Sequence, residues 1–183
     1  MSPRSSFAIL IRLRVATLAR AIGEEMGLSP HQIEGMHLAA SIHDVGKIRV
    51  QAEILNRPGK LMPLELELIR THAQSGYDIV KDVRFPWPIA RIIVEHHERV
   101  DGSGYPNRRR GDQLLLESKI VTVADVVEAM TSHRPYRPGL GLDAALEHIA
   151  EYRSVWYDAA VVDACLRLFR ENRFRFESMG RAT

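Results

Sequence analysis

The spacing of apolar residues is the feature that most constrains the fold, because it is helical along nearly the whole chain. Ile120, Val123 and Val127, for example, share one face of a helix predicted over residues 117–132. No run of strict alternation is long enough to predict a strand. The sequence therefore predicts an all-α bundle of about seven helices. The expected helices cover residues 7–26, 30–44, 63–80, 89–99, 117–132, 142–152 and 159–169.

Residues that favour helix ends agree with these boundaries. Ser29 can cap the start of the second helix, Gly27 follows the end of the first, and Pro63 suits the first turn of the third. With 183 residues, 45% of them hydrophobic, the chain is long enough to bury one sizeable core. We expect one domain over residues 1–170, followed by a polar, basic tail over residues 171–183.

Charge and cysteine content limit the possible partners and compartment. The formal net charge is only +2, so we expect no nucleic-acid partner, and the basic triplet Arg108, Arg109 and Arg110 is interpreted as a solvated loop. Three arginines interrupt the apolar stretch from Phe7 to Ile22, which excludes a membrane span there. Cys165 is the single cysteine, so no disulfide forms within the chain, and we expect a reducing cytoplasm.

Imidazoles and carboxylates that could do chemistry fall on the inner faces of the predicted helices. Apolar residues one turn before each adjacent pair direct both pairs toward the core. Such groups are costly to bury unless they share a cation, and together they suit divalent transition metals. The sequence therefore predicts a metal site. Its expected ligands are His43, Asp44, His72, His96, His97 and Asp125.

The motifs that contain these residues resemble one known family. His43-Asp44-Val45-Gly46-Lys47 is similar to the HD signature, and His96-His97-Glu98 followed by Asp101-Gly102-Ser103-Gly104-Tyr105-Pro106 resembles the HD-GYP signature. The match extends from about Ile11 to Phe169 and includes Arg134-Pro135-Tyr136-Arg137. The resemblance implies an HD-domain-like helical bundle. It also implies metal-dependent hydrolysis of cyclic di-GMP to the linear dinucleotide, to GMP or to both.

The resemblance also assigns roles to individual residues. It implies one or two divalent ions, iron or manganese, with Asp44 as the bridging, catalytic carboxylate and all six residues above as ligands. Lys47 corresponds to a catalytic lysine that meets the phosphate, and Tyr105 to a residue that lines the substrate pocket. Arg134 and Arg137 resemble further phosphate-facing cations. Diguanylate cyclase GGDEF domains are the implied protein partners.

The chain departs from the family pattern at several positions. Ile11 and Phe7 stand where the family has a histidine and, in three-metal members, a glutamate, and neither can bind a metal. Arg108 and Arg109 replace a common glycine and a hydrophobic residue. Two functions therefore stay open: an active cyclic di-GMP phosphodiesterase, or a catalytically degenerate module that binds metal, nucleotide or a GGDEF partner. Water could also complete the site, because catalytic metal centres often keep an open position.

Overall fold

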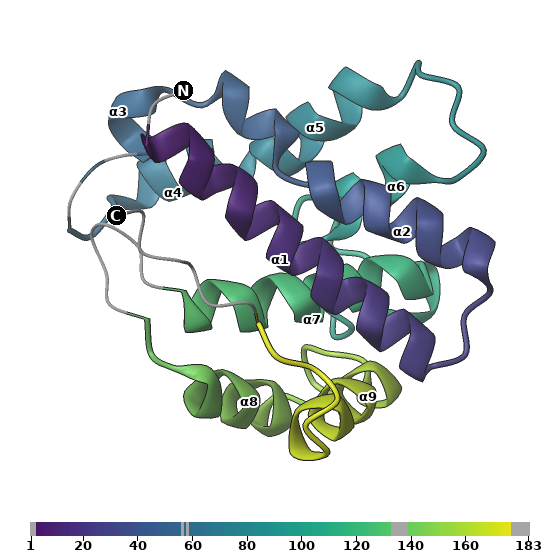
Figure 1. The fold of residues 1–183 in the computed structure, drawn as a ribbon. Helices are drawn as coiled ribbons and strands as arrows, with labels where there is room; N and C mark the ends of the chain where they lie inside the picture. The colour runs from purple at the N-terminus through teal and green to yellow at the C-terminus, as the bar shows by residue number, and fades with distance from the viewer. Residues whose placement is uncertain (1–2, 56, 58, 133–138, 177–183) are drawn as a thin grey trace.

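The computed structural model describes residues 3–55, 57, 59–132 and 139–176, with side chains from Ile11 onward. These residues form nine α-helices and two short 3₁₀ segments, and they contain no β-strand (Figure 1). The predicted all-α class is therefore confirmed. The elements are α1 (Pro3–Glu25), α2 (Pro30–Ile42), η1 (Val45–Arg49), α3 (Ala52–Leu55), α4 (Pro63–Arg70), α5 (His72–Val80), α6 (Ile89–Glu95), η2 (Gly111–Gln113), α7 (Leu116–Thr131), α8 (Leu142–Glu151) and α9 (Ala159–Arg170).

The long helices α1 and α7 organise the core. Helix α1 packs against α2 and α7, and α7 in turn packs against α8 and α6, so that α1 crosses the bundle in Figure 1. Val15, Leu18 and Ile22 form the fully buried row of α1. Ile11, one turn earlier on the same row, is partly buried. The apolar face predicted for this helix is therefore the face that meets the core.

Helix starts follow the local signals in the sequence. The hydroxyl of Ser29 accepts a hydrogen bond from the backbone N–H of Gln32. The side-chain oxygen of Gln32 accepts one from the backbone N–H of Ser29, and the two bonds form a capping box. Pro63 opens α4 as predicted. The single helix expected over residues 63–80 is divided at Thr71 into α4 and α5. The hydroxyl of Thr71 donates a hydrogen bond of 2.7 Å to the carbonyl oxygen of Leu68. This bond satisfies a backbone acceptor at the end of α4 that has no partner within the helix.

Part of the expected C-terminal tail packs on the body of the protein. Phe174 is buried with the core and Phe176 packs against it. Arg173 forms an ion pair with Glu25 at the end of α1. The residues from 177 onward lie outside the described part of the chain, and the boundary at residue 170 stays a prediction.

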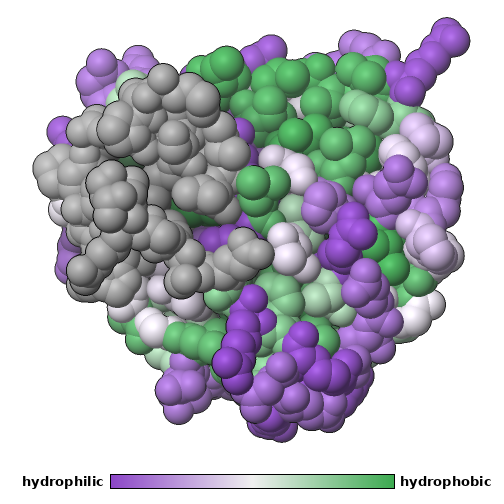
Figure 2. Space-filling view, viewed as in Figure 1, coloured by the Kyte–Doolittle hydropathy of each residue, from purple (hydrophilic) through white to green (hydrophobic). Residues whose placement is uncertain are grey.

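The described surface is mixed in character. No helix among the described residues combines the length and the apolar composition that a membrane crossing requires. On the face drawn in Figure 2, hydrophobic residues gather over the upper part of the molecule, and hydrophilic residues predominate along its right and lower edges.

Candidate metal centre

Helix ends and turns position five of the six predicted side chains, and the interior of α7 positions the sixth. His43 and Asp44 follow α2, His72 begins α5, His96 and His97 follow α6, and Asp125 lies within α7. Both adjacent pairs therefore stand in turns, where two successive side chains can converge more easily than on a helix face. The C-terminal ends of α2 and α6 also carry partial negative charge, which favours a cation beside them.

The helix expected over residues 89–99 ends earlier, at Glu95. The hydroxyl of Thr122, on α7, donates to the carbonyl oxygen of His96 at 2.9 Å. This contact gives the carbonyl a partner outside its own helix, so the chain can turn at His96 without leaving a buried acceptor unsatisfied.

Three of the four imidazoles are oriented by their own backbone. The Nδ1 atoms of His43, His72 and His96 lie 2.6, 2.7 and 2.6 Å from carbonyl oxygens three residues earlier in the chain. A carbonyl oxygen only accepts, so each Nδ1 carries the proton and donates it. In a neutral ring the remaining nitrogen, Nε2, then holds a free lone pair. Metal-ligating histidines characteristically show this arrangement.

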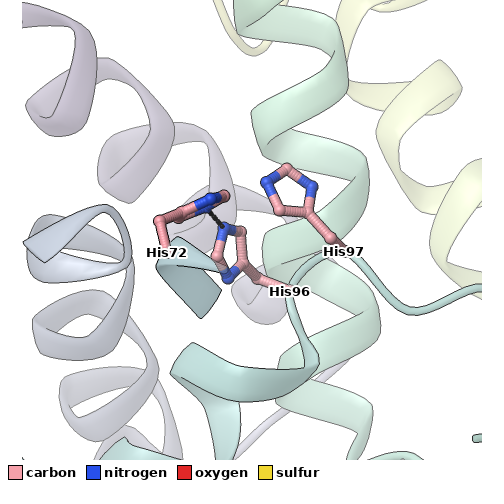
Figure 3. Close-up of side chains that lie close together, drawn as sticks. All are labelled: His72, His96 and His97. Carbon is pink, nitrogen blue, oxygen red and sulfur yellow. Dashed lines mark hydrogen bonds between the residues drawn. The ribbon is translucent and has the colours of Figure 1, made fainter. Parts of the chain in front are cut away.

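Two of these lone pairs face one another. The Nε2 atoms of His72 and His96 lie 3.3 Å apart, and His97 stands beside them (Figure 3). Two neutral rings that both donate through Nδ1 cannot form a hydrogen bond between their Nε2 atoms. A metal cation between the two nitrogens would make the contact favourable. This donor set fits a metal ion.

Asp44 lies between the two sides of the cluster. Its Oδ2 is 3.5 Å from Nε2 of His43, and its Oδ1 is 3.4 Å from Nε2 of His72. Asp125 approaches from α7, with its Oδ1 3.6 Å from Nε2 of His43. His43 Nε2 and Asp44 Oδ1 are buried, and neither has a hydrogen-bond partner among the described residues. The carboxylate of Asp44 thus faces imidazoles on both sides of the cluster.

Ligand atoms converge in two overlapping groups. One comprises His72, His96 and His97, and the other comprises His43, Asp44 and His96; within each, the ligand atoms lie within 4.8 Å of one another. His96 therefore belongs to both groups.

Burial keeps most of the imidazoles neutral. Burial lowers the pKa of His97 to about 3. The same cause lowers the pKa of His72 and holds that of His96 well below its usual range. At neutral pH these three rings therefore offer lone pairs, the form in which histidine binds metals.

The carboxylates have the opposite effect on His43. Burial disfavours its charged form, but Asp44 and Asp125 outweigh burial together and raise the pKa of His43 to about 10. Burial opposes ionisation of Asp44 as well, yet Lys47 and His43 hold the pKa of that carboxyl well below its usual range. Without a metal, a proton on His43 thus neutralises part of the negative charge of Asp44 and Asp125, which a metal ion would otherwise balance.

Two glycines allow the ligand-bearing segments to approach closely. A Cβ atom at Gly46 would lie 2.0 Å from the carbonyl oxygen of His72 and 2.5 Å from the backbone nitrogen of Gly76. A Cβ atom at Gly76 would lie 2.7 Å from the side chain of Ile93 on α6. Backbone therefore packs directly on backbone where η1 meets α5, and any side chain at position 46 would separate Asp44 from His72.

The predicted substrate-binding residues are distributed differently. Lys47 Nζ lies 2.6 Å from Asp44 Oδ2, so its charge is beside the cluster. Tyr105 stacks on His97, with ring centroids 4.8 Å apart. Arg134 and Arg137 lie outside the described residues. The structure thus brings Lys47 to Asp44 and Tyr105 to His97, and does not test the two arginines.

A cavity of about 620 Å³ adjoins the cluster at His97 and Tyr105. Its volume is within the range of pockets that hold small organic ligands. The sequence did not predict its basic lining, although two of the three arginines lie within two positions of His72 or His97. The three are Arg70, Arg99 and Arg108. Their proximity to the motifs was the available signal.

The arginine triplet lies in a loop where Arg108 and Arg110 are exposed, as interpreted from the sequence, but Arg109 departs from that interpretation. Arg109 Nη1 donates a hydrogen bond of 2.7 Å to Oε1 of the fully buried Glu95. Arg108 lines the cavity. Sequence could not reveal the ion pair because its partner is 14 residues away, inside a helix that was expected to continue.

An all-helical bundle with imidazoles and carboxylates gathered at its helix ends defines an α-helical domain with a candidate metal centre. The HD domain family model matches residues 4–161. The chain belongs to the HD domain family, and the relatives agree with the family resemblance seen in its motifs.

Two relatives are each 39% identical to the chain. The cyclic di-GMP phosphodiesterase response regulator RpfG of Xanthomonas campestris aligns over 84% of this chain and 41% of its own length. A cyclic di-GMP phosphodiesterase of Thermotoga maritima aligns over 86% and 44%. The chain therefore spans less than half the length of these curated relatives.

A solved structure has the same fold. Bd1817, an HDG"Y"P protein from Bdellovibrio bacteriovorus, superposes with a TM-score of 0.75 and covers 93% of this chain and 55% of its own. Its sequence identity is 18%, so the likeness concerns the fold alone.

Proposed function

We propose that the chain is a metal-dependent phosphodiesterase that hydrolyses cyclic di-GMP to the linear dinucleotide, to GMP or to both. The observation that carries the proposal is the pair of opposed Nε2 atoms of His72 and His96, 3.3 Å apart, in a cluster with two carboxylates. The cyclic di-GMP phosphodiesterases that resemble the chain support the choice of substrate. Because the chain spans less than half the length of these relatives, the proposal concerns hydrolysis and not its regulation.

The six clustered residues would hold the cation, with Asp44 able to bridge two ions. Bound divalent ions supply a nucleophile near neutral pH and offset the charge that develops on a phosphodiester. The backbone carbonyls that fix Nδ1 of His43, His72 and His96 keep the ligand lone pairs directed inward. Iron or manganese suits this mixture of nitrogen and oxygen ligands, and we propose one of them.

Residues around the cluster would bind and orient the substrate. Lys47 places a positive charge beside Asp44, where it would contact a phosphate held at the metal centre. Tyr105, stacked on His97, supplies an aromatic wall on which a guanine base can stack. Burial raises the pKa of Tyr105, so its hydroxyl stays protonated and can donate a hydrogen bond. Arg134 and Arg137 are proposed as further phosphate contacts from sequence alone.

A second function is favoured by the first helix. Ile11 offers no ligand atom, although its row on α1 faces the core. A site short of one ligand is compatible with a domain that binds metal and nucleotide, or a GGDEF partner, without turnover. The cytoplasmic location expected from the single cysteine stays a prediction.

Turnover of cyclic di-GMP by anaerobically purified protein, with manganese or ferrous iron added, separates the two functions. Asp44→Asn should reduce both bound metal and turnover, by roughly 10²-fold or more for turnover, because the carboxylate faces both sides of the cluster. The matched control is Asp82→Asn, which makes the same change at an exposed carboxylate outside the cluster.

Metal-dependent turnover that Asp44→Asn abolishes and Asp82→Asn preserves would support the phosphodiesterase. Stoichiometric binding of metal and cyclic di-GMP without turnover would instead support the binding module. Failure to bind any divalent transition metal would refute the phosphodiesterase and leave, of the second function, only the binding of a GGDEF partner.

A further inference from the structure

Among the described residues that line the cavity, Arg108 is the cation whose side chain has no internal partner. Arg70 forms an ion pair with Glu67 at 2.6 Å, and Arg99 stacks over the ring of Trp156, with its guanidinium carbon 3.7 Å from the centroid. Among the described residues, no acceptor lies within hydrogen-bonding distance of the exposed Arg108 side chain. Its charge is therefore available to a ligand in the cavity.

The backbone at Arg108 is in an uncommon conformation. Its φ is +53°, in the left-handed region that residues with a Cβ atom adopt at a cost of about 1 kcal/mol or more. Nothing that the exposed side chain contacts within the described residues offsets this cost. A strained residue that lines a cavity is a reason to consider a binding role.

Buried acids on both sides hold the loop in this conformation. The carboxylate of Glu98 accepts a hydrogen bond from the backbone N–H of Asn107 at 2.7 Å, and the N–H groups of Arg108 and Arg109 also stabilise its charge. Glu95 holds the side chain of Arg109 at 2.7 Å. The loop is thus fixed before any ligand arrives, which reduces the entropy that binding must offset.

We propose that Arg108 binds the phosphodiester of a cyclic dinucleotide that lies farther from the metal centre. This inference rests on the proposed function, in which the other phosphodiester lies at the metal cluster. A cyclic dinucleotide carries two phosphodiesters on one ring, so a site that holds one of them at His97 directs the second into the adjoining cavity. Guanidinium groups suit this contact because they donate two parallel hydrogen bonds to phosphate.

The test compares the binding of a hydrolysis-resistant bis-phosphorothioate analogue of cyclic di-GMP to metal-loaded wild type and three variants by calorimetry. Arg108→Gly removes the cation and also relieves the backbone strain. Arg108→Lys keeps the charge, and Arg110→Gly removes the same charge from an exposed position in the same loop that does not line the cavity.

Arg108→Gly should weaken binding by about tenfold, and its affinity should depend less on salt. Its melting temperature should not fall, because glycine accepts a positive φ without strain. Arg108→Lys should recover only part of the affinity, because an ammonium group keeps the charge and cannot form the two parallel hydrogen bonds, and Arg110→Gly should stay within about twofold of wild type. A purely structural role for Arg108 would instead lower the melting temperature and leave the affinity unchanged.

The outcomes separate this inference from the proposed function. Equal affinities for Arg108→Gly and Arg110→Gly, with cyclic di-GMP still hydrolysed, would overturn the role of Arg108 and leave the phosphodiesterase standing. Wild type that neither binds the analogue nor hydrolyses cyclic di-GMP would overturn both.

Discussion

Removing His96 should abolish the stabilisation that a bound metal gives to the fold. His96 is fully buried, and its ligand atom belongs to both groups of potential ligands. The two groups draw on the ends of α2 and α6 and on the start of α5, so one ion links segments that are separate in the chain. Metal binds such a site in the folded state and not in the unfolded chain, and binding energy therefore adds to stability.

The expected magnitude follows from this linkage. At a free metal concentration 100-fold above the dissociation constant, the folded state gains about 2.7 kcal/mol. For a protein of this size, 1 kcal/mol raises the melting temperature by about 2–4 °C, so the metal should raise it by roughly 5–11 °C. His96→Ala also leaves a cavity, which lowers the melting temperature with and without metal. Subtracting the melting temperature without metal from that with metal therefore removes the effect of the cavity.

Differential scanning calorimetry of chelated and metal-loaded protein measures this difference. We expect it to be large for wild type, near zero for His96→Ala, and unchanged for His37→Ala, which alters a partly buried histidine of α2 outside the cluster. If His96→Ala kept the full metal-dependent shift, the cluster could not be where the metal binds.

Two further predictions concern the ends of α1. Ile11→His should increase metal content and the rate of cyclic di-GMP hydrolysis together, because position 11 continues the buried row of α1. Elemental analysis measures the metal content, and a turnover assay at saturating metal measures the rate. Equal rates for wild type and Ile11→His would show that no ligand is missing. Glu25→Gln should destabilise the fold at neutral pH, because hydrogen bonds from Arg173 and Arg167 lower the pKa of Glu25 to about 2. The folded pKa is below the unfolded value of 4.5, so this stability is present above pH 4.5 and is lost as the pH falls toward 2. Urea unfolding of both proteins across that range should show the difference shrinking, and a constant difference would contradict the assignment.

Local signals in the sequence predicted most of the fold. Ser29 and Pro63 mark helix starts through interactions within one turn, and the apolar row of α1 depends only on helical geometry. The end of α6 was not predictable in this way. It depends on Thr122, which is 26 residues from His96 and supplies its hydrogen bond only when α7 is in place.

The candidate site shows the same division. The motifs named all six clustered residues, and the structure brings them together; their role as metal ligands stays a proposal. The cavity beside them was missed, because Arg70 and Arg108 approach it from segments whose proximity is a property of the tertiary fold. Spacing along the chain also could not show that His96 faces both groups of ligands.

The contact between Gly46 and the backbone of His72 has a consequence for how the family can diversify. Neither Gly46 nor Gly76 contributes a ligand atom. The missing side chain at Gly46 lets the segments that carry Asp44 and His72 meet, and the missing side chain at Gly76 lets α5 pack on Ile93 of α6. A lineage that stopped using the metal would no longer need this approach, and larger residues could accumulate at positions 46 and 76 before the ligands themselves were replaced. In a set of homologues, the identity of these two positions should therefore report whether a chain still assembles the centre.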